Sequence, residues 1–246
     1  MNRVIKSRSM SATPWMLPDH LLFLVLVWAL FTAAVGLIIA GIAIFGDITN
    51  SVWEQAATQV TRWFMLFIGV HLGYSLLPLY VAHGQTRKQF ASVSTVFVTF
   101  YTLTGALLIA LGFALEAVLY QVADWPQVLA MEHAFTGAGE YPAIILEFWT
   151  RFLMWTFGGL LLGAAFYRSD GVGWLTILAA AIPVIAVETT LTQFPPAAPV
   201  LNWLNISPAD AVSLPTALIT FGIGLAVILV MAWMAIKDIP LRNKSA

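Results

Sequence analysis

Residues 21–45 read LLFLVLVWALFTAAVGLIIAGIAIF and contain no charged residue. A helix that crosses a bilayer needs about 20 mostly apolar residues, because each adds about 1.5 Å across a hydrocarbon core of roughly 30 Å. This run also exceeds the roughly 7–15 apolar residues of a secretion signal. Although Arg3, Lys6 and Arg8 precede it as in a signal peptide, its length predicts a retained first transmembrane helix.

Five further apolar stretches of comparable length follow, and together they predict an all-α membrane protein, a bundle of six transmembrane helices. The predicted spans are Leu21–Phe45, Thr61–Val81, Val93–Tyr120, Ala143–Tyr167, Gly173–Leu191 and Leu214–Ile236. None alternates apolar and polar residues as barrel strands do. The composition agrees, since 60% of residues are hydrophobic and only 9% are charged, whereas a soluble domain is about a quarter charged. The expected division is a short cytoplasmic or interfacial segment 1–20, a transmembrane domain 21–236 and a cytoplasmic tail 237–246.

The distribution of Lys and Arg predicts that both ends of the chain are cytoplasmic. With the N-terminus inside, nine of the 11 Lys and Arg residues lie in inner segments: Arg3, Lys6, Arg8, Arg87, Lys88, Arg168, Lys237, Arg242 and Lys244. The outer loops carry acidic residues instead: Asp47, Glu54, Asp124, Glu132, Glu140 and Asp210. This asymmetry is the positive-inside pattern. It indicates a multi-pass protein of the plasma (inner) membrane, with lipid around the bundle.

Several functional classes lack support in the sequence. The net charge of -1 offers no basic field for nucleic acid, and the chain has no cysteine for thiolate chemistry. No Gly-Lys-Ser/Thr or Gly-x-Ser-x-Gly motif occurs. We therefore expect that this chain is not an enzyme and binds no cofactor.

His133 lies between Glu132 and Glu140 in a predicted outer loop. Their spacing matches no metal-ligand signature, and this loop is expected to be solvated. The segment Gly46–Gln59 is expected to be a short polar connection.

The predicted inner loop between the second and third spans has a distinctive sequence, LYVAHGQTRKQF over residues 79–90. Gly84 can end the second helix, because glycine tolerates the left-handed conformation of a helix C-terminus. Thr86 can cap the next helix by accepting a hydrogen bond from a free amide of its first turn. The third span would then begin almost at once, which predicts a tight, basic elbow at the cytoplasmic face.

This elbow resembles the loop of bacterial ABC transporter permeases of the type-2 exporter class, in which a glycine and a threonine precede two basic residues and a phenylalanine. The resemblance rests on Gly84, Thr86, Arg87, Lys88 and Phe90. It implies a short coupling helix that docks on a separate ATP-binding cassette ATPase subunit. It also implies a second permease copy or a sister permease, because six spans supply half of such a translocation domain. The alternative interpretation of Arg87 and Lys88 is ordinary membrane anchoring.

Five charged residues fall within or at the rims of the predicted spans: Arg62, Glu116, Glu147, Arg151 and Glu188. Charge inside a membrane is costly and needs partners. Glu147 and Arg151 are four residues apart, so they share a helix face, and Arg62 is expected to pair with Glu116 or Glu188. The predicted network would either fix helix packing or line an outer gate. Two other functions remain open, an ion- or proton-coupled secondary transporter and a non-catalytic membrane assembly subunit.

Two small-residue motifs add a packing prediction. Gly69 and Gly73 are spaced four apart in the second predicted span, as are Gly159 and Gly163 in the fourth. Such spacing lets helix backbones approach closely in lipid. Packing within the chain is the expected use, and a dimer interface is the alternative.

Overall fold

The computed structural model describes residues 13–131, 133–191 and 214–239. These residues form helices and no strand: α1 (Thr13–Phe45), α2 (Val52–His71), the π-helix η1 (Leu72–Leu76), α3 (Leu77–Ala82), α4 (Arg87–Ala123), α5 (Tyr141–Arg168), α6 (Asp170–Leu191) and α8 (Leu214–Lys237). Six of the resulting helical runs are long and apolar enough to cross a membrane, with α2, η1 and α3 forming one continuous run. The predicted all-helical architecture is confirmed for the described residues, and so is the prediction of six helices long and apolar enough to cross a membrane. Most of segment 1–20, the predicted outer loop 192–213 and most of the tail 237–246 lie outside the described residues.

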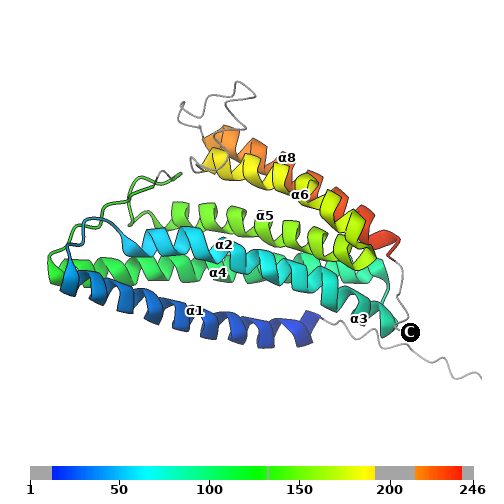
Figure 1. Ribbon diagram of the computed structural model, residues 1–246, viewed down its shortest axis with the longest axis horizontal. Coiled ribbons are helices and arrows are strands. Elements are labelled where there is room, and N and C mark those ends of the chain that lie inside the picture. The colour runs from blue at the N-terminus through cyan, green and yellow to red at the C-terminus, as the bar shows by residue number, and fades with distance from the viewer. Residues whose placement is uncertain (1–12, 132, 192–213, 240–246) are drawn as a thin grey trace, which may run out of the picture.

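The helices alternate in direction, so their connections gather at two ends of the bundle (Figure 1). We call the end with residues 83–86 the elbow end. The opposite end carries residues 46–51 and 124–140, and we call it the loop end. These names fix positions in the molecule without assigning a side of the membrane.

Helix α5 is the centre of the bundle (Figure 1). It contacts α2 and α4 on one side and α6 and α8 on the other, while α1 packs against α2 and α4. The most apolar stretch of α5 has a mean hydropathy of only 1.2, the lowest of the six spans, yet 83% of it is buried. In α1 the corresponding values are 2.8 and 22%. Polar side chains in a membrane protein face the interior, so the least apolar span is enclosed by the others.

The two small-residue motifs pack against each other within the chain. Gly69 and Gly73 face α5, and Gly159 and Gly163 face α2 and η1. A Cβ atom at any of these four positions would overlap backbone atoms of the opposite helix. The prediction of close intramolecular packing is confirmed.

The second span begins earlier than its hydropathy predicts. Ser51 caps α2, and its hydroxyl oxygen accepts a hydrogen bond of 3.0 Å from the Glu54 amide. The prediction that Gly46–Gln59 is only a polar connection is therefore wrong for its second half. Trp53, Glu54 and Ala57 are buried, so the polar residues of this turn face protein.

Candidate functional site

The elbow is a tight turn that Thr86 caps, as predicted from its sequence. Gly84 has φ of +84°, the left-handed conformation that glycine adopts without steric cost. The Thr86 hydroxyl oxygen accepts a hydrogen bond of 3.1 Å from the Gln89 amide, and the Thr86 amide donates one of 2.9 Å to the Gln89 side chain. These two bonds form a capping box, which fixes the first turn of α4 to the chain that enters it.

The predicted docking residues of the elbow differ in accessibility. Lys88, Gly84 and Thr86 are exposed. Phe90 is 1% exposed and packs edge-on against Tyr80, so its ring anchors the turn from inside the bundle. The Arg87 guanidinium donates a hydrogen bond of 2.7 Å to the backbone carbonyl of Ile239, which ties the elbow to the residues that follow α8. Only part of the predicted set is therefore free to meet another protein.

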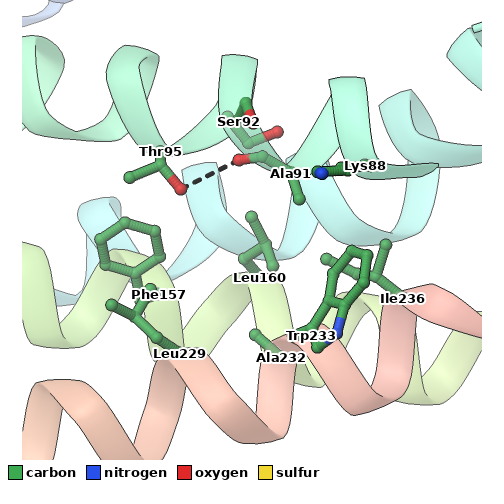
Figure 2. A pocket seen from close by; sticks show the side chains of 11 residues that line it. Lys88, Ala91, Ser92, Thr95, Phe157, Leu160, Leu229, Ala232, Trp233 and Ile236 are labelled. Carbon is green, nitrogen blue, oxygen red and sulfur yellow. Dashed lines mark hydrogen bonds between the residues drawn. The ribbon is translucent and has the colours of Figure 1, made fainter. Parts of the chain in front are cut away.

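A groove with a volume of about 360 Å³ opens beside the elbow, between α4, α5 and α8 (Figure 2). Leu160 and Ile236 contribute to its mostly apolar wall. Lys88, Ser92 and Thr95 contribute polar atoms from α4.

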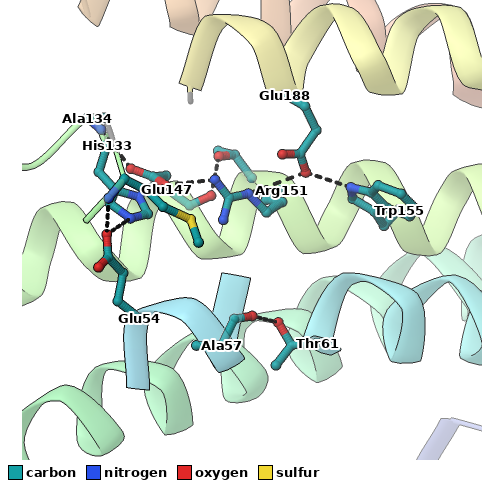
Figure 3. Close-up of polar contacts among 11 residues, drawn as sticks. Glu54, Ala57, Thr61, His133, Ala134, Glu147, Arg151, Trp155 and Glu188 are labelled. Atoms are coloured by element: carbon teal, nitrogen blue, oxygen red, sulfur yellow. Dashed lines mark hydrogen bonds and ion pairs between the residues drawn. The ribbon is translucent and has the colours of Figure 1, made fainter. Parts of the chain in front are cut away.

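At the loop end, ionisable side chains from α2, α5, α6 and the 124–140 loop come together out of solvent (Figure 3). Arg151 of α5 is the centre of this group. Its Nη2 atom lies 2.9 Å from Glu147 Oε1, and its Nε atom lies 3.3 Å from Glu188 Oε1 on α6. One arginine therefore joins two helices through two carboxylates, a geometry suited to its planar, multi-donor guanidinium.

Trp155 and Arg62 extend this ion-pair group. The Trp155 indole donates a hydrogen bond of 2.6 Å to Glu188 Oε1. The Arg62 guanidinium carbon lies 5.7 Å from the centre of the Trp155 ring, and Arg62 interacts electrostatically with Glu188 and Arg151. Among the sequence-predicted charges, the structure thus brings together Arg62, Glu147, Arg151 and Glu188.

Glu116 also lies at the loop end, but its hydrogen-bond partners lie outside this ion-pair group. Its carboxylate accepts hydrogen bonds from the Ser51 hydroxyl at 2.5 Å, the Trp53 amide at 2.8 Å and the Gln127 side chain at 3.0 Å. The first amides of a helix have no intrahelical acceptor, and a negative charge is favourable there. Glu116 therefore fastens the start of α2 to α4, and these partners do not include the other four predicted charges.

His133 completes the cluster, and the sequence-based prediction of a solvated loop is wrong for this residue. The side chain has 0% exposure. Its Nδ1 atom lies 2.8 Å from Glu147 Oε1, and its Nε2 atom lies 3.1 Å from Glu54 Oε1. Burial lowers the pKa of His133, but the hydrogen bonds to Glu147 and Glu54 outweigh burial and raise that pKa above its ordinary value.

Glu54 and His133 are the site residues that the sequence analysis missed. A signal for Glu54 was present, because Ser51 and Glu54 have the Ser-x-x-Glu spacing of a helix start before an apolar run. No comparable signal exists for His133, whose partners lie 79 and 14 residues away. Chemically, the assembled cluster can hold a proton and carry buried charge. Among the described residues, no group of three or more His, Asp or Glu side chains is arranged to hold a metal ion.

Comparisons of the chain with protein-family models, curated proteins and solved structures find no match.

Proposed function

We propose that this chain is the membrane-spanning permease subunit of an ATP-driven ABC exporter, coupled through residues 83–90 to a separate ATPase subunit. The observation that carries the proposal is the elbow. It presents Lys88, Gly84 and Thr86 to solvent on a turn held by a capping box. A docking element must be both accessible and stiff, since a loose loop would absorb the movement of the motor.

The elbow is also continuous with the rest of the bundle. It leads directly into α4, a helix of 37 residues that reaches the loop end. There Glu116 of α4 holds the start of α2 through Ser51 and Trp53. In the proposed exporter, a displacement at the elbow would be carried along this one helix to the opposite end of the bundle. This connection supports a role in which ATP hydrolysis at one side changes packing at the other.

The proposal places the chain in the plasma (inner) membrane, with both ends and the elbow in the cytoplasm. It requires two permease chains, either two copies of this chain or this chain with a sister permease. It assigns no catalytic residue to this chain, because the resemblance places ATP hydrolysis on the ATPase subunit.

The test is co-purification and coupled transport with an ATPase encoded in a neighbouring reading frame. Lys88→Glu should weaken ATPase association and uncouple ATP hydrolysis from transport, because it reverses the charge of an exposed elbow residue. Arg168→Glu is the matched control, since it reverses an exposed basic residue of the other described turn at the elbow end. Arg87 is a poorer probe because its hydrogen bond to Ile239 also stabilises the fold. Normal association and transport in Lys88→Glu would contradict the coupling role.

A second candidate function is a proton-coupled secondary transporter, and the buried chain of ionisable groups at the loop end favours it. Glu54, His133, Glu147, Arg151 and Glu188 form consecutive contacts. Reconstituted vesicles separate the two candidates. Transport driven by a pH gradient without ATPase would support the carrier, whereas transport that requires the ATPase and ATP would support the exporter.

A further inference from the structure

The two ring nitrogens of His133 both face carboxylate oxygens, from Glu54 on α2 and Glu147 on α5 (Figure 3). A neutral imidazole has one N–H donor and one acceptor nitrogen, whereas an ionised carboxylate only accepts. Between two ionised carboxylates, a neutral ring can therefore donate only one of the two hydrogen bonds. The second hydrogen bond needs one additional proton. That proton belongs either to the ring or to one of the acids.

The other contacts of the two acids place the proton on the ring. The Glu54 carboxylate also accepts hydrogen bonds from the amides of Ala130 at 2.7 Å and Met131 at 2.8 Å. Glu147 also accepts from the Ala134 amide at 2.7 Å and from the Arg151 guanidinium at 2.9 Å. Each of these neighbours donates, and hydrogen bonds donated to a carboxyl group favour its ionised form. The contacts therefore favour the extra proton on the His133 ring, which is then an imidazolium.

The balance of buried charge agrees with this assignment. Among the described residues, the charged groups that face the ring are Glu54 from α2 and Glu147 and Arg151 from α5. On the side of α4, the apolar ring of Phe113 packs on Phe135 and contributes no charge. Glu188 and Arg62 extend the cluster as an additional acid and an additional base. With His133 protonated, the acids Glu54, Glu147 and Glu188 are matched in number by the bases His133, Arg151 and Arg62.

The same contacts hold the loop on the bundle. The loop is attached to Glu54 and Glu147 through the backbone amides of Ala130, Met131 and Ala134 and through both nitrogens of His133. The ring also stacks on Phe135, with centroids 4.4 Å apart. Without the extra proton, one ring nitrogen becomes an acceptor facing a buried carboxylate. An unpaired buried charge of this kind is costly, and the simplest relief is for the loop to lift into water.

We propose that His133 is the proton-binding site of a latch, in which one bound proton holds residues 128–131 and 133–135 against α2 and α5 and its loss releases them. The ligand of this site is the proton itself. The inference does not depend on the proposed exporter function, because it concerns the attachment of the loop and not the source of energy for transport.

The direction of the pH dependence follows from the raised pKa of His133. In the open state the His133 ring has its ordinary pKa of 6.5. Below that pH the ring is protonated in both the closed and the open state, and the latch is fully held. As the pH rises from there to the raised pKa of the closed state, only the open state loses its proton. The open population should then grow by up to about tenfold per pH unit and level off above the closed-state pKa.

Hydrogen–deuterium exchange of the wild-type protein in detergent tests the latch directly. The observable is the protection of a peptide covering residues 128–135, corrected for the intrinsic pH dependence of exchange, from pH 6 to pH 10. Protection should fall progressively as the pH rises above 6.5, while a peptide from the centre of α5 should keep its corrected protection. Equal corrected protection of the loop over the whole interval would overturn the proposal, and this measurement needs no variant.

Two variants show whether His133 is the responsible group. His133→Gln cannot carry the charge, so the loop should be unprotected at pH 6 and its exchange should lose the pH dependence. His20→Gln is the matched control, because it replaces another histidine far from the loop end and should keep the wild-type profile. A wild-type pH profile in His133→Gln would show that another group titrates, and it would also overturn the proposal.

Discussion

The α-carbon of Gly69 in α2 lies so close to the backbone carbonyl of Thr156 in α5 that a Cβ atom at residue 69 would overlap that oxygen. Gly159 stands in the same relation to the carbonyl of Leu66 on the opposite helix. The two backbones meet without intervening side chains. This close approach sets the distance between α2 and α5, the two helices that supply Arg62, Glu54, Glu147 and Arg151 to the buried cluster.

We expect Gly159→Ala to destabilise the bundle, because the added methyl group meets backbone that cannot rotate away. Overpacking of this kind costs about 1–3 kcal/mol. Unfolding in a detergent–denaturant titration is the measurement. Gly36→Ala is the matched control, since its added Cβ would meet no atom within 4 Å apart from its chain neighbours and the nearby backbone of its own helix. The two variants having the same stability would show that the helices do not meet as closely as described.

We expect Arg151→Leu to be among the most damaging single substitutions, because it removes the guanidinium that Glu147 and Glu188 share and leaves the buried cluster with one base fewer than acids. Removal of one partner of a buried ion pair costs about 3–5 kcal/mol. The double variant Arg151→Leu with Glu188→Leu should recover part of the lost stability, because it makes the numbers of buried acids and bases equal again. Folded yield and unfolding midpoint test both statements. A double variant that is less stable than Arg151→Leu would contradict this account.

We expect Glu116→Gln to loosen the start of α2. The Ser51 hydroxyl, the Trp53 amide and the Gln127 side chain all donate to this carboxylate, and an amide nitrogen in place of one oxygen cannot accept. A buried donor without an acceptor costs about 1–3 kcal/mol. The readout is faster hydrogen exchange at residues 51–54. Asp47→Asn, at an exposed position of the same end, is the control and should leave that exchange unchanged. Equal exchange in the two variants would contradict the capping role of Glu116.

We expect the loop end to face the outside of the cell and the elbow end to face the cytoplasm, as the Lys and Arg distribution predicts. The chain has no cysteine, so single cysteines can report the side of the membrane. Thr49→Cys and Gly139→Cys should react with an impermeant maleimide in intact cells. Gly171→Cys and His83→Cys should react only after the membrane is opened. The four positions are exposed in the structure, and the reverse labelling pattern would invert the topology.

Much of the fold could be predicted because apolar length is a local property of the sequence. The run 21–45 needs no partner to be recognised, and the predicted fourth span, Ala143–Tyr167, differs from α5 by two residues at its start and one at its end. The prediction failed at the start of α2, where Trp53, Glu54 and Ala57 are buried by other helices. Hydropathy averages over a window, so it cannot recognise a polar turn that is enclosed by protein.

The candidate site also combines features set by neighbouring residues with features set by contacts between distant parts of the chain. The sequence by itself determined the six spans, the cap at Thr86 and the shared helix face of Glu147 and Arg151, because each depends on residues that are near neighbours along the chain. Only the tertiary structure decided that Glu116 holds α2, that Phe90 is buried, and that His133 lies between Glu54 and Glu147. Those contacts join residues from separate helices and a loop, and their partners are chosen by the packing of the whole bundle, which no local pattern specifies.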